Sequence, residues 1–186
     1  MTVSAADLRP YLTDATWFRR EPYGIHGITH VTRVLIWSAV LADRFGETPA
    51  IRVPELYWAA ATHDVERIDD GRDAGHGVRA AAWVGSRLAA ERPLAATSDL
   101  GFVAELDRWH EVTDSEIGRW SLELLLFKDA DGLDRVRIHD LNPKFLRSQL
   151  APTLAGQAQR LMEETTHLRD PADVLDVAVR LEIIQP

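Results

Sequence analysis

Cysteine is absent from the 186-residue sequence. This absence excludes disulfide bonds, zinc sites built on thiolates, iron–sulfur clusters and cysteine nucleophiles. Any metal that the chain binds must therefore be held by nitrogen and oxygen donors. A chain without cysteine also fits a reducing compartment.

Long hydrophobic runs are missing as well. The longest apolar stretches, such as residues 124–127, are far too short to cross a bilayer. The opening segment MTVSAADLRPYL has no basic start followed by an apolar stretch, so we expect no secretory signal. These features predict a cytoplasmic protein that does not associate with membranes.

Positive charge is in short supply: 21 basic side chains face 29 acidic ones, for a formal net charge of −8. Such a surface argues against binding to nucleic-acid polymers. It does not exclude a small anionic substrate, because a bound divalent cation can reverse the field inside one pocket.

Repeats, long linkers and β-branched runs bounded by hairpin turns are also absent, whereas apolar residues recur at helical spacing almost throughout. We therefore predict one all-α domain over residues 1–186, a bundle of about seven to eight helices. A short helix is expected after Ser4. The longer ones are expected near residues 28–45, 54–63, 76–91, 99–110, 115–137, 152–165 and 171–184, with Thr113 or Ser115 as the cap of the helix that reaches residue 137.

Two polar residues that interrupt an apolar helix are the first sign of chemistry. His63 and Asp64 follow the apolar residues 58–61, where an unpaired charge would be costly. His30 lies early in the long second helix, and Asp131 follows the apolar run 122–127. Two imidazoles and two carboxylates form a complete ligand set for manganese, magnesium, iron, cobalt, nickel or zinc.

Three segments resemble the HD superfamily of metal-dependent phosphohydrolases: HGITHVTRV (26–34), AAATHDVERIDD (59–70) and KDADGLD (128–134). The resemblance covers about residues 22–146, and helices from 150 to 186 are expected to pack on that part. It implies an all-helical bundle whose metal ligands are His30, His63, Asp64 and Asp131. Asp129 is the competing assignment for the last ligand.

Fuller patterns in that family hold a second metal with extra histidines, and Asp64 would then bridge the two ions. The candidates for a second metal or for substrate contacts are His76, His110 and His26. The alternatives stay open: His76 can be a plain helix-start residue, His110 a favourable cation at a helix C-terminus, and His26 a loop residue.

The polar loop after the dyad supplies candidates for catalysis and phosphate binding. The proton acceptor is expected among Asp64, Glu66 and Asp69. Phosphate-binding candidates are Arg67, Arg72 and Arg79, followed by Arg33, Lys128, Lys144 and Arg147. The alternative is a solvated loop in which the basic and acidic side chains form ordinary surface pairs.

The expected function is therefore hydrolysis of a small phosphorylated metabolite or nucleotide, using one or two divalent ions. Two alternatives remain, a di-iron oxygenase of the HD type and a non-catalytic, metal-stabilised ligand-binding or regulatory domain. A homodimer is a further expectation.

Overall fold

A computed structural model describes residues 3–46 and 51–186. The expected all-helical fold of seven to eight helices is confirmed, since 66% of the chain is helical and the described ranges contain no β-strand. Their only extended pairing is an isolated bridge between Ser4 and Gln185 near the two ends of the chain.

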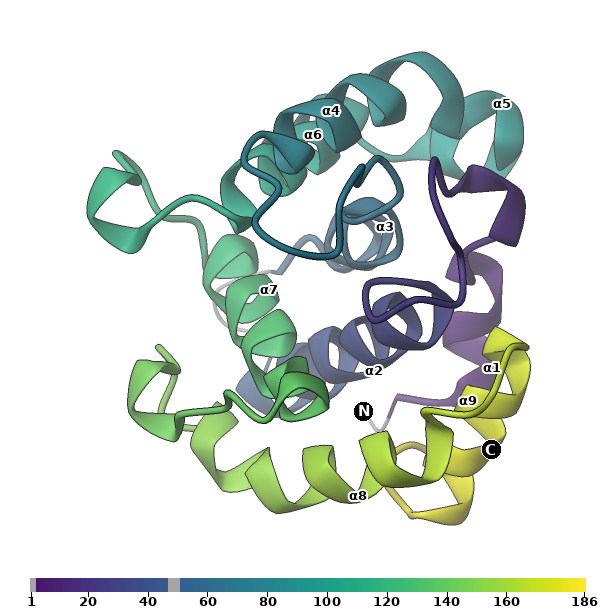
Figure 1. Cartoon of the computed structure of the whole chain (residues 1–186), viewed down its shortest axis with the longest axis vertical. Helices are drawn as coiled ribbons and strands as arrows, with labels where there is room; N and C mark the ends of the chain where they lie inside the picture. The colour runs from purple at the N-terminus through teal and green to yellow at the C-terminus, as the bar shows by residue number, and fades with distance from the viewer. Residues whose placement is uncertain (1–2, 47–50) are drawn as a thin grey trace.

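Helix α2 (Ile28–Phe45) forms the centre of the molecule. It packs against α3 (Val53–Thr62), which begins with Pro54 in its first turn, as predicted. Gly46, with φ of 90°, ends α2 at the predicted place. Neighbours surround α2, and its residues 30–42 are all buried (Figure 1).

Helices α4 (His76–Trp83) and α6 (Leu100–His110) form a second layer that covers α3 (Figure 1). The segment predicted as one helix, 76–91, is helical throughout, but it is not uniformly α-helical. A π-helical turn, Val84–Leu88, separates α4 from the short α5 (Ala89–Glu91). This wider turn buries both Val84 and Leu88 completely while the three residues between them stay exposed.

Helix α7 (Leu122–Leu133) closes one side of α2 and begins later than predicted. Thr113 makes no capping hydrogen bond with its side chain, and Asp114–Glu116 forms only a short 3₁₀ turn. The Ser121 side chain instead accepts a hydrogen bond from the Leu124 N–H and caps the helix. A 3₁₀ segment, Asp134–Ile138, follows α7.

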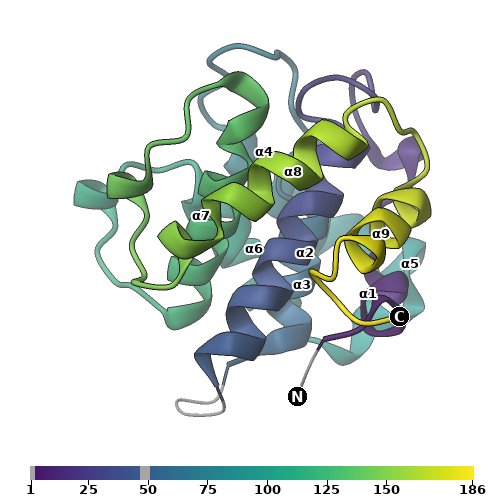
Figure 2. The same ribbon diagram turned by 90° about the horizontal axis from the view of Figure 1, so that it is seen from below.

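The C-terminal helices α8 (Ala155–Thr165) and α9 (Pro171–Arg180) pack on the side of α2 that faces away from α3 (Figure 2). The short α1 (Ala5–Leu8), capped by Ser4 as expected, lies beside α9. Helix α9 ends before the predicted Ile184, and Glu182 has a left-handed φ of 58°. No described helix combines the length and apolar character needed to span a bilayer.

Candidate metal centre

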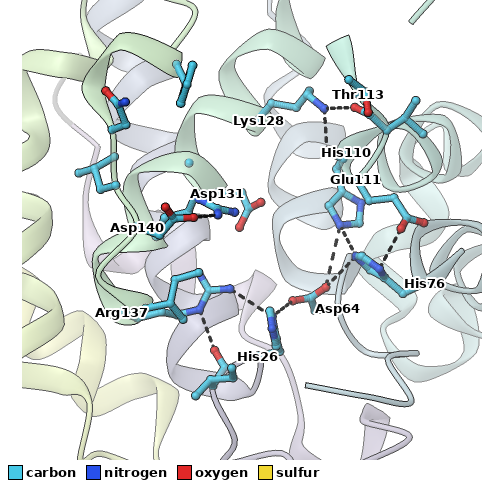
Figure 3. Close-up of a pocket in the computed structure, with 18 of the residues that line it drawn as sticks. His26, Asp64, His76, His110, Glu111, Thr113, Lys128, Asp131, Arg137 and Asp140 are labelled. Atoms are coloured by element: carbon cyan, nitrogen blue, oxygen red, sulfur yellow. Dashed lines mark hydrogen bonds and ion pairs between the residues drawn. The ribbon is translucent and has the colours of Figure 1, made fainter. Parts of the chain in front are cut away.

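Six chemistry-bearing side chains from five helices converge at one end of the α2–α3 pair. His30 lies in the first turn of α2, and Asp131 lies in the last turn of α7. The other four lie at helix ends, where side chains can point along the helix axis into the space between elements: His63, Asp64, His76 and His110. Figure 3 shows four of them, Asp64, His76, His110 and Asp131, on the wall of a pocket.

The first group comprises His30, His63, Asp64 and Asp131, the four predicted ligands. His30 Nε2 lies 3.1 Å from His63 Nε2, 3.4 Å from Asp64 Oδ2 and 3.5 Å from Asp131 Oδ1. Donor atoms of His30, His63 and Asp131 all lie within 4.8 Å of one another. The structure thus brings together side chains separated by up to 101 positions in sequence.

The second group lies on the other oxygen of Asp64. His76 Nε2 lies 3.2 Å from Asp64 Oδ1 and 2.8 Å from His110 Nε2, and His110 Nε2 lies 3.9 Å from the same oxygen. Gly77 makes this approach possible, because a Cβ there would lie 2.4 Å from the carbonyl oxygen of Asp107. His76 and His110 therefore join the site, as the two-ion alternative required.

Hydrogen bonds to the outer ring nitrogens determine which imidazole nitrogen faces the centre. The Nδ1 atoms of His63, His76 and His110 donate to the carbonyl oxygens of residues 60, 73 and 107, at 2.9, 2.7 and 2.6 Å. Because a carbonyl oxygen can only accept, each Nδ1 carries a proton, and in the neutral ring Nε2 then presents its lone pair.

Facing lone pairs repel each other unless a cation lies between them. Two nitrogens bound at about 2.1 Å and at right angles to one ion lie about 3 Å apart. The Nε2–Nε2 distances of 3.1 Å in the first group and 2.8 Å in the second match this spacing. The buried His and Asp donors can therefore hold a metal ion.

The protonation states also suit metal binding. Burial lowers the pKa of His63 to about 4 and that of His110 to about 3, so both rings are neutral at pH 7. Burial opposes ionisation of Asp131, but the neighbouring His30 and Arg137 outweigh it and lower its pKa to about 2. Burial also opposes ionisation of Asp64, but His63, His26 and His30 outweigh it and hold the pKa of Asp64 well below its usual range. These four side chains thus need lose no proton before they bind a cation.

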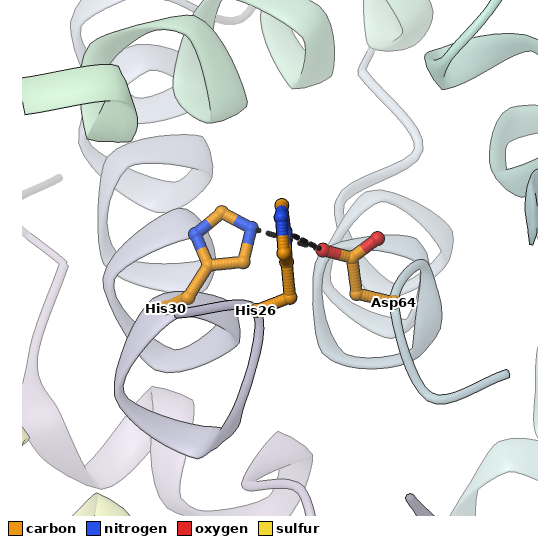
Figure 4. Close-up of side chains that lie close together, drawn as sticks. All are labelled: His26, His30 and Asp64. Atoms are coloured by element: carbon orange, nitrogen blue, oxygen red, sulfur yellow. Dashed lines mark hydrogen bonds and ion pairs between the residues drawn. The ribbon is translucent and has the colours of Figure 1, made fainter. Parts of the chain in front are cut away.

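His26 also reaches the centre. Its Nδ1 lies 2.9 Å from Asp64 Oδ2, and its ring points with that of His30 toward this oxygen (Figure 4). Arg137 Nη2 lies 3.1 Å from the same Nδ1 (Figure 3). Burial lowers the pKa of His26 and favours its neutral form. The structure therefore places His26 beside Asp64 as a further candidate metal ligand.

The two candidates for the last ligand have different surroundings. Asp129 is fully buried, and its two oxygens accept hydrogen bonds from the backbone N–H groups of Arg147 and Ser148, both at 2.7 Å. These bonds attach α7 to the loop 140–149. The Asp131 side chain is 30% exposed and faces His30. The geometry thus favours Asp131 over Asp129.

A cavity of about 780 Å³ opens over the cluster and is lined by Asp64, His76, His110 and Asp131. Five basic side chains share its wall: Arg67, Lys128, Arg135, Arg137 and Arg147. Arg67 is the most closely held, because it donates to the carbonyl oxygens of residues 69 and 71 and places Nη1 3.5 Å from Asp64 Oδ1.

Several predicted residues lie away from this cavity. Five of them are not among the described residues that line it: Glu66, Asp69, Arg72, Arg79 and Lys144. Asp69 and Arg72 are exposed, and Glu66 pairs with Arg19 at 3.4 Å. Arg79 donates to the Asp73 carboxylate at 2.6 Å and to the Glu66 carbonyl oxygen at 3.0 Å. These two hydrogen bonds stabilise the loop 66–75.

Sequence reasoning missed Asp134, a buried partner of His30, and placed Arg33 among the phosphate-binding candidates, whereas the structure pairs Arg33 with Asp134. Asp134 Oδ2 accepts a hydrogen bond from His30 Nδ1 at 2.8 Å, and Arg33 binds both oxygens of Asp134. Asp134 lies three positions after Asp131 and Arg33 three positions after His30. A spacing of three places both members of a pair on one face of a helix. This spacing was the sequence signal by which Asp134 and Arg33 could have been identified.

Glu111 and Lys128 are further members of the wall. Glu111 Oε2 lies 3.1 Å from His76 Nδ1. Lys128 Nζ donates to the carbonyl oxygens of His110 and Val112 at 2.8 and 2.6 Å, which ties the end of α6 to α7.

Comparisons with protein-family models, with curated proteins and with solved structures found no match for this chain.

Proposed function

We propose that this chain is a metal-dependent phosphohydrolase of the HD type that acts on a small phosphorylated metabolite or nucleotide. One observation carries the proposal: the Asp64 carboxylate lies between two groups of imidazoles at a cavity whose wall includes arginine side chains. His30, His63 and Asp131 on one side of Asp64, and His76 and His110 on the other, would each help to hold an ion, and two such ions would supply Lewis acidity for attack on phosphorus.

A divalent ion in this centre supplies Lewis acidity that draws charge from a phosphate group and makes neighbouring water more acidic. Arg67 and Arg137 line the cavity beside Asp64 and His26, where their guanidinium groups would donate hydrogen bonds to phosphate oxygens. Of the three expected proton acceptors only Asp64 lines the cavity, and it would accept a proton through an oxygen that no ion occupies; Glu66 and Asp69 do not line the cavity. No covalent intermediate is required.

The donor set narrows the choice of metal. Four or five imidazoles with two carboxylates favour manganese, iron, cobalt, nickel or zinc over magnesium, which prefers oxygen ligands. We therefore propose a transition-metal ion as the cofactor.

The test is phosphate release by metal-free protein to which each metal is added back separately. The substrates are a panel of phosphomonoesters and of nucleoside mono-, di- and triphosphates. We expect release with at least one metal and its loss in His63→Ala. His167→Ala is the matched control, because His167 is exposed and distant from the cavity wall. Metal-loaded protein that releases no phosphate from any substrate would overturn the proposal.

A di-iron oxygenase is the second candidate, because it requires His76 and His110 in the site and both are there. Protein loaded with ferrous iron would then consume oxygen in the presence of a substrate and release no phosphate. A protein that binds metal, consumes no oxygen and releases no phosphate would instead be a non-catalytic binding domain.

A further inference from the structure

A buried chain of hydrogen bonds connects the metal centre to the C-terminal helices. It runs from His30 in α2 to Asp134 after α7, back to Arg33 in α2, and on to Thr165 at the end of α8. None of these four side chains is more than 2% exposed. Such a continuous buried polar path is costly to form unless every group in it is paired.

The innermost link orients a metal ligand. His30 Nδ1 donates to Asp134 Oδ2 at 2.8 Å, which leaves the lone pair of Nε2 directed at His63, Asp64 and Asp131. A carboxylate bonded to the outer nitrogen of a metal-binding histidine fixes its tautomer and its ring orientation.

Arg33 holds that carboxylate in place. Its Nε and Nη2 atoms bind Asp134 Oδ1 and Oδ2 at 2.5 and 2.9 Å, in the paired geometry that a guanidinium offers and an ammonium does not. Arg137 assists by donating to the Asp134 carbonyl oxygen at 3.1 Å. With both oxygens of Asp134 bound, its carboxylate cannot rotate away from His30.

Thr165 completes the chain on α8. Its hydroxyl donates to the Leu161 carbonyl oxygen at 2.6 Å and accepts a hydrogen bond from Arg33 Nη1 at 3.2 Å. The Nη1 group of the guanidinium is therefore held by α8. This helix lies outside the three segments that resemble the HD superfamily.

We infer that Arg33 and Thr165 are positioning residues for the metal ligand His30, so that α8 is a functional part of the metal centre. This inference rests on the metal centre of the proposed function but not on the reaction catalysed there. Neither residue touches the cavity; both act through Asp134.

The test measures metal affinity and the His30 tautomer in the full-length protein. Arg33→Lys keeps the charge but loses the paired geometry, and Thr165→Val removes only the hydroxyl. We expect Arg33→Lys to weaken binding of the tightest ion by about 10- to 100-fold, the usual effect of changing such supporting residues. Thr165→Val should weaken it less, and Thr165→Ser should restore it.

Thr32→Val is the matched control. The Thr32 hydroxyl is also buried and donates to the carbonyl oxygen four residues earlier, at 2.7 Å, but it has no place in this chain of bonds. We expect it to leave metal affinity unchanged. Thermal unfolding of each variant reports any general loss of stability separately from the loss of affinity.

Nitrogen-15 NMR of the metal-free protein provides the second measurement. We expect wild-type His30 to carry its proton on Nδ1, and Arg33→Lys to show a mixture of both tautomers. Folded Arg33→Lys and Thr165→Val proteins with unchanged affinity would overturn the inference, as would a wild-type His30 protonated on Nε2. If Arg33→Lys does not fold, the Thr165→Val and Thr165→Ser pair decides the question alone.

The two proposals can fail separately. A wild-type protein that binds no metal would refute the metal centre, whereas the tautomer measurement would still show whether the chain of bonds orients His30. A protein that binds metal but releases no phosphate would leave the positioning inference intact.

Discussion

The imidazoles of His30 and His63 and those of His76 and His110 share the carboxylate of Asp64, yet their electrostatic surroundings differ. The first pair has a second carboxylate, Asp131, at 3.5 Å from His30. The second pair instead has the Arg67 guanidinium nearby, 3.2 Å from His76 Nε2. A carboxylate attracts an incoming divalent cation and a guanidinium repels it.

The outer supports differ in the same direction. His30 donates to a carboxylate, Asp134, at 2.8 Å, whereas the shortest bonds of His76 and His110 go to peptide carbonyl oxygens, and the Glu111 carboxylate lies farther from His76 Nδ1, at 3.1 Å. A carboxylate makes the imidazole a stronger ligand than a neutral carbonyl does. The comparison teaches that the two groups are unequal: the first should bind an ion tightly, and the second more weakly.

The largest effect is expected from Asp64→Asn, which should affect both groups equally. The amide has no charge to share between two ions, so we expect phosphate release to fall by roughly 1,000-fold or more. Metal content measured by elemental analysis should fall in parallel. Asp173→Asn, at an exposed position of α9, is the control. An Asp64→Asn protein that keeps both its metal and its activity would contradict the shared-carboxylate arrangement.

Removing one ligand from each group tests their inequality directly. His30→Ala should weaken binding of the tight ion by at least about 100-fold, because loss of a ligand exceeds the usual effect of losing its support. His76→Ala should leave one tightly bound ion per chain. Titration of metal-free protein with each ion by calorimetry gives both affinities. Equal losses in the two variants would show that the groups do not differ as proposed.

Arg67→Ala should change both the affinity of the second group for its ion and the binding of the substrate. Loss of a charged hydrogen bond costs about 1.5–3 kcal/mol, so we expect the KM to rise by about 10- to 100-fold. Removal of the guanidinium should at the same time strengthen binding of the weaker ion. Arg72→Ala, on the same loop but exposed and away from the cavity wall, is the control. A similar KM for both variants would remove Arg67 from the phosphate site.

The smallest effect on the metal centre is expected at Asp107, whose Oδ2 accepts a hydrogen bond from the Thr62 hydroxyl at 2.9 Å. Burial raises the pKa of this carboxyl well above its usual range, and the charge of Asp64 adds to the shift. A folded-state pKa above the unfolded one means that the contribution of Asp107 to stability is complete below about pH 4. This contribution is then lost as the pH rises toward the folded-state pKa.

Asp107→Asn stays neutral at every pH and avoids that loss. We therefore expect metal-free Asp107→Asn to gain stability relative to wild type as pH rises from 4 to 8, by at most about 1.4 kcal/mol per pH unit. Urea unfolding at pH 5 and pH 8 measures the difference. A gap between the two proteins that stays constant with pH would show that Asp107 is ionised in the folded state.

The parts of the site that could be predicted from sequence are those with a local cause. His63 and Asp64 follow an apolar helical turn, and His30 and Asp131 lie in apolar helices, so burial alone marked them as unusual. Ser4, Pro54 and Gly46 marked helix ends because capping and backbone preferences act within one turn.

The loop 66–75 shows where local reasoning stopped. Arg67, Arg72 and Arg79 look alike in sequence, yet only Arg67 lines the cavity among them. Its direction depends on the carbonyl oxygens of Asp69 and Gly71, which receive its hydrogen bonds. The path of the loop decides where those oxygens lie, and composition does not specify that path.

The sequence by itself determined an all-helical chain, most of its helix ends and four side chains whose chemistry calls for a metal. Only the tertiary structure decided that His76, His110 and His26 join them, that Asp131 rather than Asp129 faces His30, and that Asp134 and Arg33 support it. The physical reason is distance along the chain. Arg33 and Asp134 are 101 positions apart and meet because α2, α7 and α8 pack around one core, which no local pattern of residues encodes.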